Sequence, residues 1–222
     1  MSYHVINLNE FKRVDHFRYF QSLAYPYVGI TCEVDITEFY QFIKQSHLPV
    51  FLSFLWCVSK AANDVREFRY RIKGDQLVEF DFCDTSHTVA KDDETYAYCV
   101  LKADMDFISF LKMAVPKHES AKLSGTIDED PDEALSMIFI SALPWFHFTD
   151  LTQHVPFPAD SNPRISWGKF IERDNKYIVA MNVLCHHALV DGIHIAQFFN
   201  KLNVRMQEVI HLDPKTASFY NQ

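Results

Sequence analysis

The residues best suited to chemistry lie in one short segment, HHALVDG at positions 186–192. It follows residues 177–185, which are apolar and β-branched enough to predict a central strand. A histidine at the end of a strand can project its imidazole into a cleft, and an unperturbed imidazole, with a pKa of ~6.5, accepts a proton at neutral pH. The segment therefore indicates His187 as a candidate general base.

Two other interpretations of this segment stay open. An isolated histidine pair is usually half-buried, and Asp191-Gly192 is also an ordinary turn before a helix. A metal site would use His187, Asp191 and His194, but a glycine and a predicted turn separate them and a convincing fourth ligand is lacking. We therefore expect no metal here.

The elements that position this segment alternate between helices and strands. Pro49 opens a predicted buried helix through residue 63, and Asp35 with Glu38 resembles a capping box at the start of another. Residues 68–73 and 76–80 alternate in polarity around Gly74-Asp75, which predicts a β-hairpin. Residues 105–113 favour a helix and residues 134–142 a strand. The pattern indicates a mixed α/β fold.

The segment after Asp191 predicts the helix that closes the fold. Its apolar residues recur every three or four positions, which is typical of an amphipathic helix lying on a sheet. The residues expected to face the sheet are Ala196, Phe199, Leu202, Met206 and Val209.

Composition limits the classes of function. The chain has 222 residues, 48% of them hydrophobic, which predicts one packed domain over residues 1–222. Its net charge of −8 argues against nucleic-acid binding but leaves room for an anionic cofactor held by a few local lysines. Its five cysteines are widely spaced without a C-x-x-C pair, and neither a signal peptide nor a stretch long enough to span a membrane is visible. We expect a cytoplasmic protein that does not interact with membranes.

Four segments, in order, resemble a known family. HHALVDGIHIAQFFNKL, from residue 186, is similar to the active-site segment of chloramphenicol acetyltransferases. Residues 139–149 (FISALPWFHFT) resemble their oxyanion-serine segment, residues 67–81 their central hairpin, and residues 9–22 their N-terminal helix. The resemblance implies a two-layer α/β sandwich, with a mixed sheet packed by helices, in a homotrimer whose sites lie between subunits. Dihydrolipoyl acyltransferase cores share H-x-x-x-D-G but usually have D-H-R where this chain has H-H-A.

The resemblance also implies roles for individual residues. His187 would deprotonate an acceptor hydroxyl, which then attacks acetyl-CoA directly, and Ser141 would donate a hydrogen bond to the oxyanion. Asp191 would pair with Arg13 in a buried structural ion pair that holds the turn carrying His187, whereas His186 would be structural.

The binding residues implied by the resemblance flank this centre. Tyr19 and Phe20 would line the acceptor pocket, and Ser166 stands where relatives carry a threonine that helps to bind the intermediate. Lys169 would meet a phosphate of CoA and Phe170 its adenine, although an exposed lysine beside core aromatics would look the same.

Chloramphenicol is the acceptor that the resemblance implies, but the acceptor region departs from the family pattern. Pro26 replaces a usual cysteine, and residues 151–161 diverge and are shortened by one position. Two alternatives follow. One is an acetyltransferase of the same fold for another alcohol, and the other is a binding protein that retains the fold without catalysis.

Overall fold

A seven-stranded mixed sheet forms the centre of the molecule, described by a computed structural model over residues 2–128 and 130–212. Its strand order is β2-β10-β8-β7-β5-β6, and β9 pairs with β10. Strand β7 pairs in parallel with both β8 and β5. The pairs β2–β10, β10–β8 and β5–β6 are antiparallel. The strands are β2 Tyr27–Asp35, β5 Asp84–Ala90, β6 Tyr96–Leu101, β7 Met137–Leu143, β8 Arg164–Gly168, β9 Ile171–Arg173 and β10 Lys176–His186.

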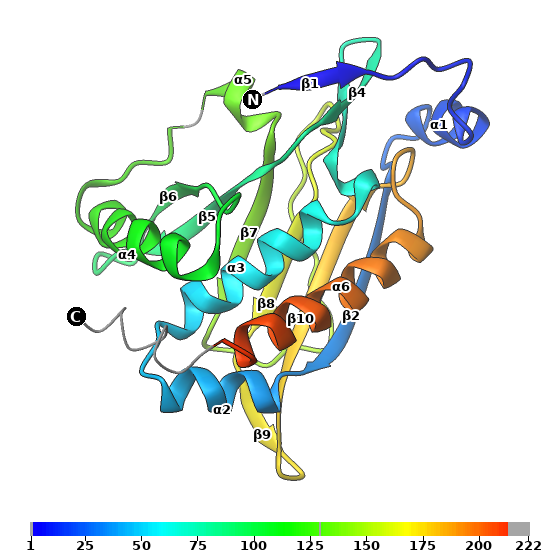
Figure 1. The fold of residues 1–222 in the computed structure, drawn as a ribbon. Coiled ribbons are helices and arrows are strands. Elements are labelled where there is room, and N and C mark those ends of the chain that lie inside the picture. The colour runs from blue at the N-terminus through cyan, green and yellow to red at the C-terminus, as the bar shows by residue number, and fades with distance from the viewer. Residues whose placement is uncertain (1, 129, 213–222) are drawn as a thin grey trace.

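Helices cover one face of this sheet, which confirms the predicted two-layer α/β sandwich. In Figure 1, α3 and α6 cross in front of β8, β10 and β2, with α4 beside β5 and β6. Helix α1 lies at the end of the sheet where α6 begins. The helices are α1 Val14–Gln21, α2 Thr37–Gln45, α3 Val50–Asn63, α4 Phe107–Ser124, α5 Pro131–Ala134 and α6 Gly192–Ile210, with a 3-10 turn at Arg66–Arg69. The predicted domain also includes residues 1, 129 and 213–222, which lie outside the described residues.

The predicted hairpin is confirmed. Strands β3 (Tyr70–Lys73) and β4 (Gln76–Phe80) pair antiparallel, and β1 (Tyr3–Val5) adds to β4 as the third strand of a small sheet. Gly74 has a φ of +62°, the left-handed conformation that this tight turn requires and that glycine adopts without strain.

Helix α3 is the buried helix expected from the sequence. Eleven of its residues are buried, and the eight apolar ones among them pack into one core with the inner face of the sheet and with α6. A helix that is apolar over most of its circumference has to be buried on several sides, and α3 lies between the sheet, α4 and α6.

The predicted inner face of α6 is partly wrong. Leu202, Met206 and Val209 are buried as expected, but Ala196 is exposed and Phe199 only partly buried. Ile195 and Phe198 occupy the core instead, one position earlier. Because adjacent positions are apolar at both places, the period fits either phase, and packing against the sheet decides between them.

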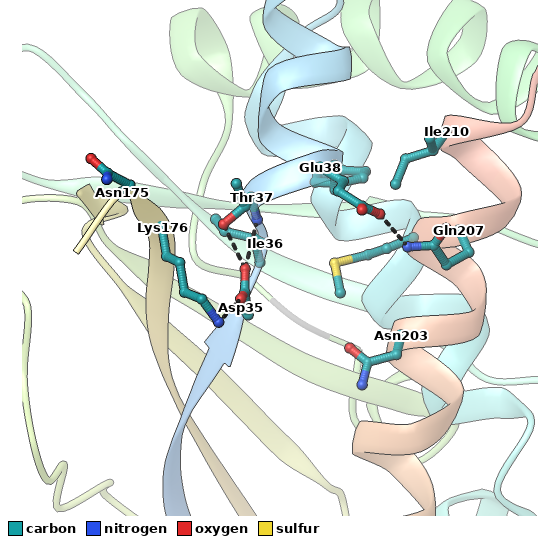
Figure 2. A pocket seen from close by; sticks show the side chains of 11 residues that line it. Asp35, Ile36, Thr37, Glu38, Asn175, Lys176, Asn203, Gln207 and Ile210 are labelled. Carbon is teal, nitrogen blue, oxygen red and sulfur yellow. Dashed lines mark hydrogen bonds and ion pairs between the residues drawn. The ribbon is translucent and has the colours of Figure 1, made fainter. Parts of the chain in front are cut away.

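The predicted capping box of α2 is also partly wrong. The Asp35 carboxylate accepts hydrogen bonds from the Thr37 backbone N–H (3.0 Å) and hydroxyl (2.6 Å), so it does satisfy the start of the helix. Glu38 does not return to Asp35; its carboxylate accepts from Gln207 of α6 at 3.0 Å (Figure 2). A tertiary contact has replaced the local one.

Candidate active site

His187 lies in the turn between β10 and α6 and is held on several sides. Its backbone N–H donates to the Pro26 carbonyl at 2.7 Å, and its Nδ1 lies 2.9 Å from the Val190 carbonyl oxygen. A carbonyl oxygen can only accept, so Nδ1 carries the proton and Nε2 carries the lone pair. The Phe20 ring stacks on the imidazole with centroids 3.8 Å apart. The contacts fix the tautomer and orientation that a general base needs.

Arg13 and Asp191 meet as expected and secure this turn. Arg13 Nη1 donates to Asp191 Oδ2 at 3.1 Å, and its Nη2 donates to the His187 carbonyl at 3.4 Å. The expectation of a buried pair is wrong, because the Asp191 side chain is 42% exposed. The carboxylate end of the pair is therefore partly exposed to solvent.

Asp191 also caps α6. Its carboxylate accepts from the Gly192 N–H at 2.7 Å, while His194 Nδ1 accepts from the Asp191 N–H at 2.9 Å. This reciprocal arrangement satisfies two N–H groups at the start of the helix. The Gly192 hydrogen bond, ahead of the Arg13 guanidinium, lowers the pKa of Asp191, although partial burial opposes the shift.

His186 is buried and has a different environment. Its Nδ1 accepts from the Ala188 N–H at 3.3 Å, and its ring contacts Tyr27 edge-on. Burial lowers its pKa to about 4, so the imidazole is neutral at physiological pH. These contacts agree with a structural role.

Ser141 and Ser166 belong to a polar row that crosses four strands. The sheet register places Ser141 opposite Ser166, Ser166 opposite Asn182, and Asn182 opposite Thr31. Residues that face each other in register project from the same face of a sheet. Asn182 donates to Thr31 Oγ1 at 2.8 Å and accepts from Gln153 Nε2 at 2.5 Å. The row therefore continues into the loop after β7.

A cavity of about 600 Å³ opens over this row. Ser141 and Ser166 both line it, together with aromatic and aliphatic side chains such as Phe139 and Tyr96. Its polar wall contains Gln153 and the bidentate ion pair between Asp160 and Arg164. The size suits a small organic molecule.

Within one chain, His187 does not reach this cavity. Of the residues that the structure describes, the cavity lining includes neither His187 nor Tyr19 or Phe20. Asn182 precedes His187 by five positions on β10, which corresponds to ~16 Å of extended strand. The candidate base and the candidate oxyanion donor therefore occupy separate parts of the subunit.

The other predicted binding residues lie on α1 and directly after β8. Tyr19 is 62% exposed beside Phe20 on α1. Lys169 is exposed in the turn after β8, where a phosphate could approach it. Phe170 is partly buried and makes edge contacts with Tyr40 and Phe54, so its ring is fixed among aromatic neighbours.

A second cavity, of about 480 Å³, lies at the opposite end of β10 between β2, α2 and α6 (Figure 2). Its polar groups pair with one another: Lys176 contacts Asp35 at 3.0 Å, and Gln207 donates to Glu38. Lys176 begins β10 whereas His186 ends it, so this cavity is remote from the base. We assign it no part in the chemistry.

Sequence analysis missed three members of the polar wall, Gln153, Asp160 and Arg164, as well as Asn182 in the row. The available signal was the divergence of residues 151–161, which contain two of them. Arg164 precedes Ser166 by two positions on β8, whereas Asn182 lies on β10 and only the register places it beside Ser166.

The described residues contain neither a cluster of metal ligands nor a membrane-spanning helix. No group of three or more His, Cys, Asp or Glu side chains in residues 2–128 and 130–212 is arranged to hold a metal ion. In the same part of the chain, no helix is long and apolar enough to cross a membrane.

Known proteins resemble this chain over most of its length. The family model described as chloramphenicol acetyltransferase matches residues 1–203. Chloramphenicol acetyltransferase of Proteus mirabilis is 27% identical over 204 residues, covering 89% of this chain and 92% of the relative. Chloramphenicol acetyltransferase 2 of Haemophilus influenzae is 26% identical, covering 95% and 100%.

Solved structures also resemble this chain over most of its length. A chloramphenicol acetyltransferase structure at 26% identity matches with a TM-score of 0.82, covering 92% of this chain and all of that chain. A probable dihydrolipoamide acetyltransferase from Listeria monocytogenes, at 15% identity and a TM-score of 0.65, shares the fold alone. The chain therefore belongs to the chloramphenicol acetyltransferase family.

Proposed function

We propose that the protein transfers the acetyl group of acetyl-CoA to the hydroxyl of chloramphenicol or a related small alcohol. The observation that carries this proposal is the fixed tautomer of His187, whose Nδ1 donates to the Val190 carbonyl and whose Nε2 carries a lone pair. Family membership supplies the reaction type, and the cavity beside Ser141 supplies space for an acceptor.

In the proposed reaction, Nε2 of His187 removes the acceptor's hydroxyl proton as its oxygen attacks the thioester carbonyl. Ser141 donates to the oxyanion of the tetrahedral intermediate, and Ser166 helps to bind that intermediate. When the intermediate collapses, the carbon–sulfur bond breaks and the protonated imidazole returns its proton to the CoA thiolate. General-base catalysis of this kind is worth ~10²–10⁴-fold.

We further propose that the catalytic site forms between subunits of a homotrimer. The separation of His187 from the cavity within one chain supports this, because base and oxyanion donor must meet at one carbonyl group. In such an assembly, His187 of one subunit faces the Ser141 cavity of the next, with Tyr19 and Phe20 at its entrance. Sedimentation at equilibrium tests the subunit number, and a monomer with full activity would contradict the arrangement.

For acetyl-CoA, the proposed contacts are Lys169 with a phosphate and Phe170 with the adenine. The exposure of Lys169 and the fixed ring of Phe170 suit these roles. We propose a cytoplasmic location, where acetyl-CoA is available, and a role in antibiotic resistance if chloramphenicol is the natural acceptor.

The test mixes purified protein, acetyl-CoA and chloramphenicol and follows thiol release with a chromogenic disulfide. We expect acceptor-dependent turnover in the wild type and its near-complete loss in His187→Ala. If chloramphenicol is inert, a panel of other alcohols tests the alternative acceptor. Absence of both acetyl-CoA binding and turnover would instead support a non-catalytic binding protein.

A further inference from the structure

The cavity beside Ser141 contains a charged pair that the reaction itself does not use. Arg164 Nη1 and Nη2 donate to Asp160 Oδ1 and Oδ2, each at 2.7 Å. The Arg164 side chain is 9% exposed and that of Asp160 25%, and both residues line the cavity. The pair is therefore a fixed part of the wall that a bound molecule would meet.

The carboxylate of this pair has hydrogen-bonding capacity left. A carboxylate has ~four lone-pair positions. Among the described residues, Arg164 occupies two of them. The Tyr27 hydroxyl shares its one proton between the Asp160 carbonyl, at 3.0 Å, and Oδ1, at 3.1 Å, and so occupies at most a third. Arg164 also donates to the Asn162 carbonyl, and its guanidinium lies over the Phe139 ring at 5.2 Å. The remaining position suits a neutral O–H or N–H donor from a ligand.

The spacing along β8 sets the distance between this pair and the residues proposed to take part in the reaction. Arg164 and Ser166 are two positions apart on β8, so they project from the same face ~7 Å apart. Ser166 is paired with Ser141 on β7. A donor at the far end of a phenylpropyl-sized acceptor would therefore lie near the pair while its reacting hydroxyl lies near Ser141 and Ser166. Phe139, which is opposite Arg164 in the register, would lie beside the ring.

From this geometry we propose that the Asp160–Arg164 pair is a specificity determinant, which selects neutral acceptor alcohols carrying a hydrogen-bond donor at the end remote from the reacting hydroxyl. This rests on the proposed function for the identity of the reacting end, but ligand selection by the cavity is measurable without turnover. A hydrogen bond to a charged group contributes enough to give a preference of ~10- to 100-fold.

The experiment compares three ligands on one frame. Hydrocinnamyl alcohol has an apolar ring, dihydro-p-coumaryl alcohol adds a phenolic hydroxyl at its far end, and the methyl ether of that phenol removes only the donor. We measure binding of each to the whole protein by calorimetry, and kcat/KM with acetyl-CoA separately. The phenol is expected to bind ~10- to 100-fold more tightly than the other two.

Two double variants test whether the pair is responsible. Asp160→Leu with Arg164→Met removes both charges together and should reduce the preference to about one. Asp64→Leu with Arg205→Met is the control, because Arg205 also makes a bidentate contact with an aspartate, donating from Nε and Nη2 to Asp64 at 2.8 Å, away from the cavity. This control should keep the preference. The ether comparison in wild-type protein needs no variant to fold.

The outcomes separate this inference from the proposed function. Equal binding of phenol and ether to the wild type, or a preference that survives loss of the pair, overturns the inference even if His187-dependent turnover is found. A preference that follows the pair, without turnover on any acceptor, supports the inference and contradicts the proposed acetyl transfer.

Discussion

The cap at Asp191 allows a sharp test of what holds the turn that carries His187. Asp191→Ala removes the hydrogen bond to the Gly192 N–H and the ion pair with Arg13, whereas Asp191→Asn keeps a side chain that can still cap. The matched control is Asp106→Ala, because Asp106 caps α4 by accepting from the Ser109 N–H at 3.0 Å, away from the turn that carries His187.

The expected magnitudes follow from the exposure of the pair. Loss of an aspartate cap costs ~1 kcal/mol. An ion pair whose carboxylate is 42% exposed adds at most about 1 kcal/mol. Asp191→Ala should therefore lower the free energy of unfolding by ~1–2 kcal/mol and Asp191→Asn by less than ~1 kcal/mol. Asp106→Ala should cost ~1 kcal/mol without loss of activity.

Urea denaturation measures the stabilities, and the thiol-release assay measures turnover. Asp191→Ala should reduce kcat more than its stability loss explains, because Asp191 and Arg13 both secure the turn that carries His187. The folded pKa of Asp191 lies below its unfolded value, so its contribution is present above pH ~4 and is lost as pH falls through the folded pKa. A loss of 3 kcal/mol or more in both variants, of the size known for buried pairs, would refute this reasoning.

Three further outcomes test other parts of the structure. Ser141→Ala should lower kcat ~10²–10³-fold with little change in the urea midpoint, and a drop of less than ten-fold in thiol release would argue against its oxyanion role. Burial and the neighbouring His118 lower the pKa of His87 to about 3. Between pH ~6.5 and 3, the unfolded chain therefore binds a proton at this histidine that the folded protein does not bind. Stability should therefore fall as pH drops from ~6.5 toward 3, and His87→Gln should flatten that fall in urea titrations; identical pH profiles would contradict it. Burial raises the pKa of Asp84 to about 6, so stability is fully present below pH ~4 and is lost as pH rises through 6. Asp84→Asn should be more stable than wild type at pH 8, by up to ~3 kcal/mol, and no gain in thermal scans at that pH would count against a destabilising buried charge.

Local patterns predicted much of the fold because they act over a few residues. Gly74 marked the β3–β4 hairpin, and the apolar run after Pro49 marked α3. The inner face of α6 was misassigned at Ala196 because two helical phases fit the same apolar residues. Glu38 was misassigned because its partner, Gln207, is far away in the sequence.

The candidate site was likewise predicted only in part from the sequence. The sequence by itself indicated His187, Ser141 and the Arg13–Asp191 contact, because motif spacing and family resemblance are visible within short segments. Tertiary structure decided the Nδ1–H tautomer of His187, the exposure of Asp191, and the row from Ser141 to Thr31. It also decided that Asp160 and Arg164 line the cavity and that His187 does not. These features depend on strand register and on burial, which join residues from different strands and loops, and no local pattern in the sequence encodes them.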